Sequence, residues 1–225
     1  MELLQNIPVE VDVPAILKSV RIKPDSPDGQ ALAALMETMR PAIKPKVLYR
    51  VAYIHAKHAE AVELEGVRLT SKVLRVNLDQ AERVFPFVAT CGTEVETLSR
   101  QETDMLRQYV LDMLKERVLR QAITHLLDHL RTTYFPGKLA MMNPGSLADW
   151  PLREQVPLFA LLGDVKQAIG VELTESFLMS PVKSVSGLIF PTEVTFENCQ
   201  LCPREGCPGR RATYNALLAQ EKYQM

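Results

Sequence analysis

The stretch SRQETDMLRQYVLDMLKERVLRQAITHLLDHLRTT, residues 99–133, carries the strongest structural signal of the chain. Its apolar residues recur at helical spacing with charged residues mostly between them, a pattern typical of a helix packed on a core. Ser99 and Glu102 fit a capping box, in which each side chain binds a free backbone N–H of the first turn. We expect one helix from Ser99 to about Thr133, roughly 50 Å long at 1.5 Å per residue, which is enough to cross a whole domain.

Strands are expected on both sides of this helix. β-Branched and aromatic residues are concentrated at 46–56, 62–78, 83–92 and 171–191. Further helices are expected at 27–40, at 152–170 in two pieces joined by Gly163-Asp164, and at 210–224. Residues 1–24 are expected to be irregular or extended. This order predicts an α+β fold, in which a central antiparallel sheet carries long helices packed on it.

The composition narrows the function classes. The chain has 225 residues, of which 47% are apolar and 24% charged, and its net charge is −1. No global charge attracts nucleic acid or an anionic membrane, and no apolar run approaches the length of a membrane-spanning helix. The N-terminus lacks a basic segment followed by an apolar run, so we expect no signal peptide and a cytoplasmic location. G-x-G-x-x-G, P-loop, G-x-S-x-G and H-E-x-x-H motifs are all absent from the sequence.

Three of the four cysteines lie in CQLCPREGCPGRR, residues 199–211. Cys199, Cys202 and Cys207 form C-x2-C-x4-C, and thiolates two residues apart can bind one metal from a tight turn. Cys91, at the end of a predicted strand, is the remaining cysteine and would supply a fourth ligand across the fold. Zinc and an iron–sulfur cluster both suit four thiolates. The alternative is a cysteine-rich turn with reduced, unused thiols.

Residues 169–190, IGVELTESFLMSPVKSVSGLIF, resemble the activation domain of cobalamin-dependent methionine synthase. The shared pattern is G-x-x-LTES-x-x-M-x-P-x-x-SVSG, preceded by a Pro-Gly loop and a helix. The resemblance is strongest over about 100–191 and excludes the cysteine tail. It implies a C-shaped α+β fold with a central antiparallel sheet. It also implies S-adenosylmethionine as methyl donor for remethylating cobalamin after one-electron reduction of cob(II)alamin, with a separate electron donor such as flavodoxin or ferredoxin.

The resemblance transfers unevenly to the S-adenosylmethionine loop, where the family has an arginine, three residues, then Gly-Tyr. The glycine matches Gly145, which follows Pro144, and backbone contacts at these two residues are expected to remain. The arginine position is Met141 and the tyrosine position is Ser146. The charged contact to the ligand's carboxylate is therefore missing, and a site built for such a bond loses much without it.

Two stretches supply the other candidate ligand-facing or corrinoid-facing side chains: Ser146, Asp149 and Trp150 in the loop, and Glu175, Ser184 and Ser186 in the following strands. Gly187 would allow close approach of a backbone. The alternative for the loop is a helix–helix connection with Trp150 packed in the core. The alternative for the strands is ordinary alternation of polar side chains facing solvent.

Together these features predict an accessory protein of corrinoid-dependent methyl transfer. It would bind a cobalamin-carrying partner and support reductive reactivation through a [4Fe–4S] cluster on the four cysteines, because one-electron chemistry and the Cys-Pro ending favour such a cluster. One alternative is an S-adenosylmethionine-dependent reactivation domain acting in trans with a structural zinc. Another is a non-catalytic chaperone of a corrinoid protein.

We expect residues 1–191 to form the activation-domain-like part, with 192–225 as a tail packed on it. The homocysteine, folate and cobalamin domains of methionine synthase are not expected here.

Overall fold

The computed structural model describes residues 1–207 and 209–224. Within them, eight strands form one sheet in which every paired neighbour is antiparallel, and two short strands form a separate hairpin. The large sheet contains β1 (Glu2–Leu4), β2 (Lys46–Tyr49), β3 (Ala52–Lys57), β4 (Ala61–Leu64), β5 (Val67–Thr70), β6 (Arg83–Thr90), β7 (Leu139–Met142) and β10 (Ser184–Pro191). The hairpin pairs β8 (Glu172–Leu173) with β9 (Met179–Ser180).

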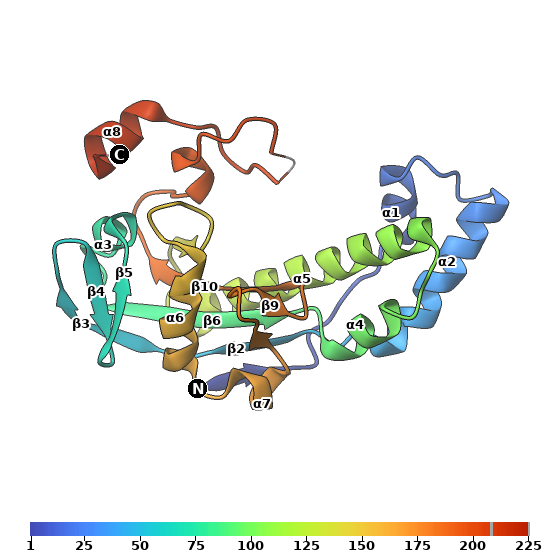
Figure 1. Ribbon diagram of the computed structural model, residues 1–225, viewed down its shortest axis with the longest axis horizontal. Coiled ribbons are helices and arrows are strands. Elements are labelled where there is room, and N and C mark those ends of the chain that lie inside the picture. The colour runs from blue at the N-terminus through green and yellow to red at the C-terminus, as the bar shows by residue number, and fades with distance from the viewer. Residues whose placement is uncertain (208, 225) are drawn as a thin grey trace.

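The helices lie on both faces of the sheet (Figure 1). They are α1 (Val13–Ser19), α2 (Pro27–Met39), α3 (Lys72–Asn77), α4 (Thr93–Ser99), α5 (Met105–Thr133), α6 (Gln155–Leu162), α7 (Val165–Ile169) and α8 (Ala216–Tyr223), with 3-10 turns at Arg40–Ala42, Leu152–Glu154 and Asn198–Leu201. The predicted α+β class with a central antiparallel sheet and long helices on it is confirmed.

Strand β6 is the centre of the sheet, because β2, β3 and β10 all pair with it. From Val84 to Thr90 its residues are buried on both faces, as expected for a strand with helices above and below. The single strand expected over 46–56 is observed as β2 and β3, which pair with β6 in one register from Lys46↔Thr90 to Tyr53↔Arg83. Between the two strands, the Arg50 N–H still donates to Pro86 O of β6, and the Arg50 guanidinium donates to Leu161 O.

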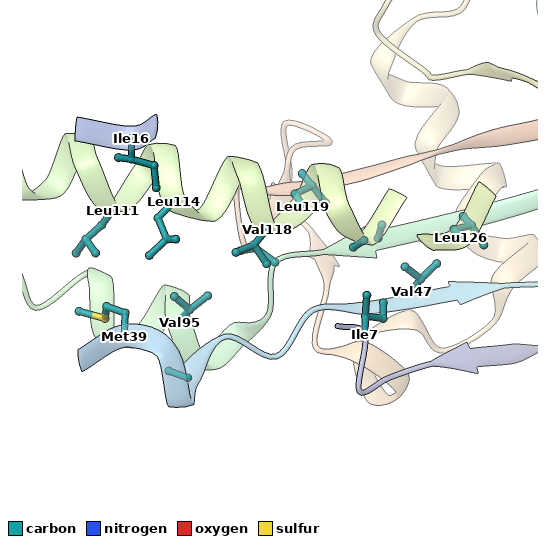
Figure 2. Packing of buried hydrophobic residues seen from close by; sticks show 14 of the residues in the cluster. Ile7, Ile16, Met39, Val47, Val95, Leu111, Leu114, Val118, Leu119 and Leu126 are labelled. Atoms are coloured by element: carbon teal, nitrogen blue, oxygen red, sulfur yellow. The ribbon is translucent and has the colours of Figure 1, made fainter. Parts of the chain in front are cut away.

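Helix α5 covers one face of the sheet, and α1, α2 and α4 pack against the part of α5 that extends beyond the strands (Figure 1). Figure 2 shows the apolar side chains of α5, including Leu111, Leu114 and Val118, directed towards α4 and the sheet. The predicted helix start at Ser99 is wrong. Ser99 is the last residue of α4, and α5 begins after Asp104, whose carboxylate accepts the Arg107 N–H at 2.9 Å. At 29 residues the helix is about 43 Å long.

The opposite face carries α6 and α7, and its core extends under α3 and the tail. Phe196, Leu201 and Tyr223 of the tail are buried in the same apolar cluster as Trp150 and Phe190. Helix α3 lies in a region expected to form only strands, and α1 in a region expected to be irregular, so both expectations are wrong for these segments.

Figure 1 shows α3 and the tail at one end and α1 with α2 at the other, both rising from the body of sheet and α5, which gives the molecule a C shape. Among the described residues, no helix combines the length and the apolar character that crossing a membrane requires.

Candidate functional site

The loop at 143–150 joins β7 to the helices on the opposite face and folds as a compact turn. Asn143 Nδ2 donates to Ser186 O at 2.8 Å, and the Ser146 N–H donates to Asn143 O at 3.1 Å. Gly145 has φ +84°, which favours glycine, and its N–H donates to Trp150 O at 2.7 Å. Pro144 is buried, whereas Gly145 and Ser146 are exposed. The exposed tip therefore offers the Ser146 hydroxyl but not the Gly145 N–H.

Asp149 joins this loop to the start of α3. Its carboxylate accepts the Ser71 hydroxyl, the Lys72 N–H at 3.2 Å and the Val73 N–H at 3.0 Å. The Ser71 hydroxyl oxygen in turn caps the helix by accepting the Leu74 N–H at 2.9 Å. The first-turn N–H groups of a helix have no partner within the helix, and a carboxylate there is favourable. Asp149 is thus committed to holding α3 against the loop.

Trp150 is completely buried in the apolar cluster on the α6 side. Its indole Nε1–H has no hydrogen-bond partner among the described residues. The structure therefore places this ring in the core and not at the rim of the loop. Core packing was the alternative to a ligand-facing position.

Ser186 is the centre of a buried chain of polar groups. Its hydroxyl donates to Gln155 Oε1 at 3.1 Å, and Gln155 Nε2 donates to Phe177 O at 2.9 Å. Because the Ser186 carbonyl also accepts the Asn143 side chain, one chain of hydrogen bonds links the loop, β10, α6 and the β8–β9 hairpin. The sequence analysis did not identify Gln155 or Asn143 as site residues. The only available signal was Gln155 itself, a single polar residue at the start of the apolar run QVPLFALL.

The β8–β9 hairpin presents an apolar tip to solvent. Phe177 and Leu178, between the two strands, are 38% and 56% exposed, and Glu175 of the same turn is also exposed. Phe177 has φ +62°, an unfavourable value for a bulky residue, which the surrounding hydrogen bonds hold in place. We name this surface the hairpin tip. A turn that exposes two large apolar side chains side by side in the sequence is a candidate interaction surface.

The other predicted strand residues are used within the sheet. The Ser184 hydroxyl donates to Thr90 Oγ1 at 3.0 Å. Gly187 does allow a close approach, but the backbone that approaches is that of β7: a Cβ at Gly187 would clash with Met142 O. Of the predicted ligand-facing residues, only Gly145, Ser146 and Glu175 are exposed.

The four cysteines lie in two different parts of the structure. Cys91 is fully buried in the apolar cluster beneath α5, and burial raises the pKa of its thiol to about 12. Cys199, Cys202 and Cys207 lie partly exposed in the tail, which packs on the other cluster. Residues 1–207 and 209–224 contain no group of three or more His, Cys, Asp or Glu side chains placed to hold a metal ion. Cys91 thus lies apart from the three tail cysteines, and the described residues do not gather those three into a metal-holding group either.

A groove of about 1050 Å³ lies elsewhere, between α3, the start of β6 and the tail. Its lining includes Asn77, Arg83, Phe135, Thr192 and Lys222. None of the predicted ligand-facing residues lines it.

Comparisons with known proteins agree with this architecture. The model of the family described as vitamin B12 dependent methionine synthase, activation domain, matches residues 144–197. A crystal structure of the MetH reactivation domain bound to AdoHcy is similar with a TM-score of 0.60 and 17% sequence identity, over 89% of this chain and 82% of that chain. No curated protein matches the chain in sequence. The resemblance to the methionine synthase activation domain, inferred from residues 169–190, is confirmed. The family model matches that segment, and the similar fold extends over most of the chain.

Proposed function

We propose that this chain is an accessory protein of corrinoid-dependent methyl transfer. It binds a cobalamin-carrying partner in the cytoplasm and supports the reductive reactivation of cob(II)alamin, for which a separate protein such as flavodoxin or ferredoxin supplies the electron. The observation that carries the proposal is the family match at 144–197, because this segment contains both exposed stretches described above, the loop tip and the hairpin tip.

The partner surface in this proposal consists of the hairpin tip together with Gly145 and Ser146. The two are connected through the buried chain of Asn143, Ser186 and Gln155, so that the partner meets a preorganised surface. Preorganisation supports binding because little side-chain or loop entropy remains to be lost. The exposed apolar side chains provide the area whose removal from water stabilises the complex.

S-adenosylmethionine does not fit this loop in the family's way. Met141, at the position of the family's arginine, is partly buried and packs against the cluster beneath α5. The Gly145 N–H already binds Trp150 O, and the Asp149 carboxylate is bound to α3. No step of the proposed function therefore passes through S-adenosylmethionine on this chain.

The test uses the cobalamin-binding domain of a methionine synthase, loaded with cob(II)alamin and titrated with this protein. We expect saturable binding. In the presence of reduced flavodoxin, we expect the cob(II)alamin spectrum to change to that of the one-electron-reduced cobalamin faster with this protein than without it. Leu178→Asp should raise Kd at least tenfold, equivalent to about 1.4 kcal/mol. Leu217→Asp is the matched control, because Leu217 is 66% exposed but lies in α8, outside the matched segment.

The outcomes separate the candidate functions. Binding without faster reduction would leave the chaperone alternative. Saturable binding of S-adenosylmethionine to this protein alone, measured by calorimetry, would favour the reactivation domain acting in trans. Equal loss of binding in both aspartate variants would show that the hairpin tip is not the partner surface, and no binding by the wild-type protein would overturn the proposal.

A further inference from the structure

We propose that the groove between α3, the start of β6 and the tail binds a small organic anion, in which a carboxylate or phosphate headgroup is attached to an apolar body. The residues that line the groove belong neither to the loop at 143–150 nor to the hairpin tip. This inference therefore goes beyond the corrinoid function, and either one can fail while the other holds.

The groove opens where two paired strands of the sheet separate. The ladder between β6 and β10 ends at Phe85↔Ile189, although β6 begins at Arg83 and β10 continues to Pro191. The same register would place Pro191 opposite Arg83, but proline has no backbone N–H to donate to the ladder. Beyond this point β6 pairs with β3 and β10 pairs with β7. Arg83 and Pro191 therefore line the opening between the two strands.

Arg83 provides a cation that is held in place but has no acidic partner. Its guanidinium carbon lies 5.6 Å from the centre of the Phe85 ring and 5.7 Å from that of Tyr134, and its Nη2 donates to Tyr134 O at 3.1 Å. Among the described residues it forms no ion pair, and its Nε and Nη1 donors have no partner. A guanidinium held on aromatic rings offers its remaining donors to a carboxylate or phosphate in a fixed geometry. We therefore expect the acidic headgroup to bind Arg83.

The tail supplies a second available cation. Lys222 of α8 also lines the groove, and its Nζ lies 5.2 Å from the centre of the Tyr223 ring without forming an ion pair in the described part of the chain. The Tyr223 ring is buried, and its hydroxyl donates to Asn77 Oδ1 at 2.6 Å, which fixes this end of α8 to α3. Arg75, which lines the groove as well, already pairs with Asp79 at 2.8 Å. Lys222, unlike Arg75, is thus available to an anion.

The rest of the lining suits a small ligand with an apolar body. Val76 and Phe135 are half-buried and Val194 is 55% exposed, so a body placed against them removes apolar surface from water. A volume of about 1050 Å³ is ample for a cofactor-sized molecule. The exposed carboxylates of Glu82 and Glu193 also line the groove. Their charge opposes a ligand with many negative charges, so a single acidic headgroup is favoured over a polyanion.

The experiment titrates the full chain, without any corrinoid protein, with naphthoate and with naphthyl phosphate, and follows binding by calorimetry. Naphthol is the uncharged probe with the same apolar body. We expect one saturable site per chain for at least one of the two anions, and the difference between them identifies the preferred headgroup. Naphthol should bind roughly tenfold more weakly. Arg83→Met removes the charge but keeps an apolar side chain, and should raise Kd roughly tenfold, whereas Lys222→Met should raise it roughly threefold.

Arg68→Met is the matched control, because Arg68 is exposed in β5 and lies outside the groove, so its Kd should equal that of wild type. Thermal unfolding checks that each variant is folded. Since Lys222 is exposed on α8, Lys222→Met keeps the test valid if Arg83→Met does not fold. The proposal is overturned if neither anion binds, if naphthol binds as tightly as the anions, or if the folded groove variants bind as tightly as Arg68→Met. Because the titration contains no corrinoid protein, failure of partner binding at the hairpin tip would leave its result unchanged.

Discussion

Replacing Asp149 tests whether the loop at 143–150 serves the fold or a ligand. In Asp149→Ala, the Ser71 hydroxyl and two backbone N–H groups at the start of α3 lose their acceptor. A helix cap contributes about 1 kcal/mol, and hydrogen bonds to a charged group contribute roughly 1.5–3 kcal/mol each, without being additive. Because water replaces part of these bonds in the half-buried site, we expect a loss of about 2–3 kcal/mol. For a domain of this size that corresponds to a fall in Tm of roughly 5–10 °C.

The assay is thermal and urea unfolding followed by circular dichroism. Asp149→Asn keeps one acceptor oxygen and should lose about half as much stability. Asp128→Ala is the control, since Asp128 is exposed on α5 and pairs only with Arg131 among the described residues, and its Tm should stay within about 2 °C of wild type. If Asp149→Ala unfolds at the wild-type temperature but binds the corrinoid partner more weakly, the structural reasoning is refuted and Asp149 is a binding residue.

Three further predictions concern buried groups. Lys115→Met should destabilise the protein by about 1–3 kcal/mol, measured by urea unfolding, because Glu96, 2.8 Å away, then keeps a buried charge whose remaining cationic partner is the largely exposed Arg100. Adding Glu96→Gln should recover part of the loss, and no recovery would contradict this account. Gly187→Ala should cost about 1–3 kcal/mol through its clash with the end of β7, whereas Gly209→Ala, with open space around it, should be neutral. Cys91 should resist iodoacetamide at pH 8 in the folded protein, as read by mass spectrometry, because its pKa is about 12 instead of the usual 9. The folded thiol keeps its proton while the unfolded one loses it, so the contribution of Cys91 to stability should fall as pH rises from about 9 to 12; rapid labelling of native Cys91 would refute its burial.

The sequence predicted elements whose signals are local. Ser26 caps α2 by accepting the Gly29 N–H at 3.1 Å, and the helices around Gly163-Asp164 break where expected. The Ser99 prediction failed because the same Ser-x-x-Glu pattern occurs at the end of α4, where the Ser99 hydroxyl donates back to Glu96 O. Periodicity could not distinguish a continuous helix from a turn followed by a new cap at Asp104.

Other features depend on distant residues and had no local signal. The six residues of α3 contain β-branched side chains and are too short to show helical periodicity, and their helical form is supported by a carboxylate 78 positions away from Ser71. The chain of polar groups likewise joins Ser186 to Gln155, which is 31 positions away in the sequence, and to Asn143, which is 43 positions away. Residue type identified Ser186 as polar, but only the fold shows that its hydroxyl faces Gln155.

The loop and the hairpin differ in what the structure leaves available. In the loop and at the end of β7, the positions that the family uses for its ligand are apolar or already bonded: Met141 is partly buried against the cluster beneath α5, and the Gly145 N–H binds Trp150 O. In the hairpin, Phe177 and Leu178 remain exposed, and the Phe177 backbone is held at an unfavourable φ. A strained backbone at an exposed residue lowers the stability of the fold, and the exposed side chain adds no core packing to offset it. Such strain is found mostly at functional sites. In the proposed function, the hairpin is the docking surface and the methyl donor is left to the partner. Loss of partner binding in Leu178→Asp would therefore locate the function in the hairpin.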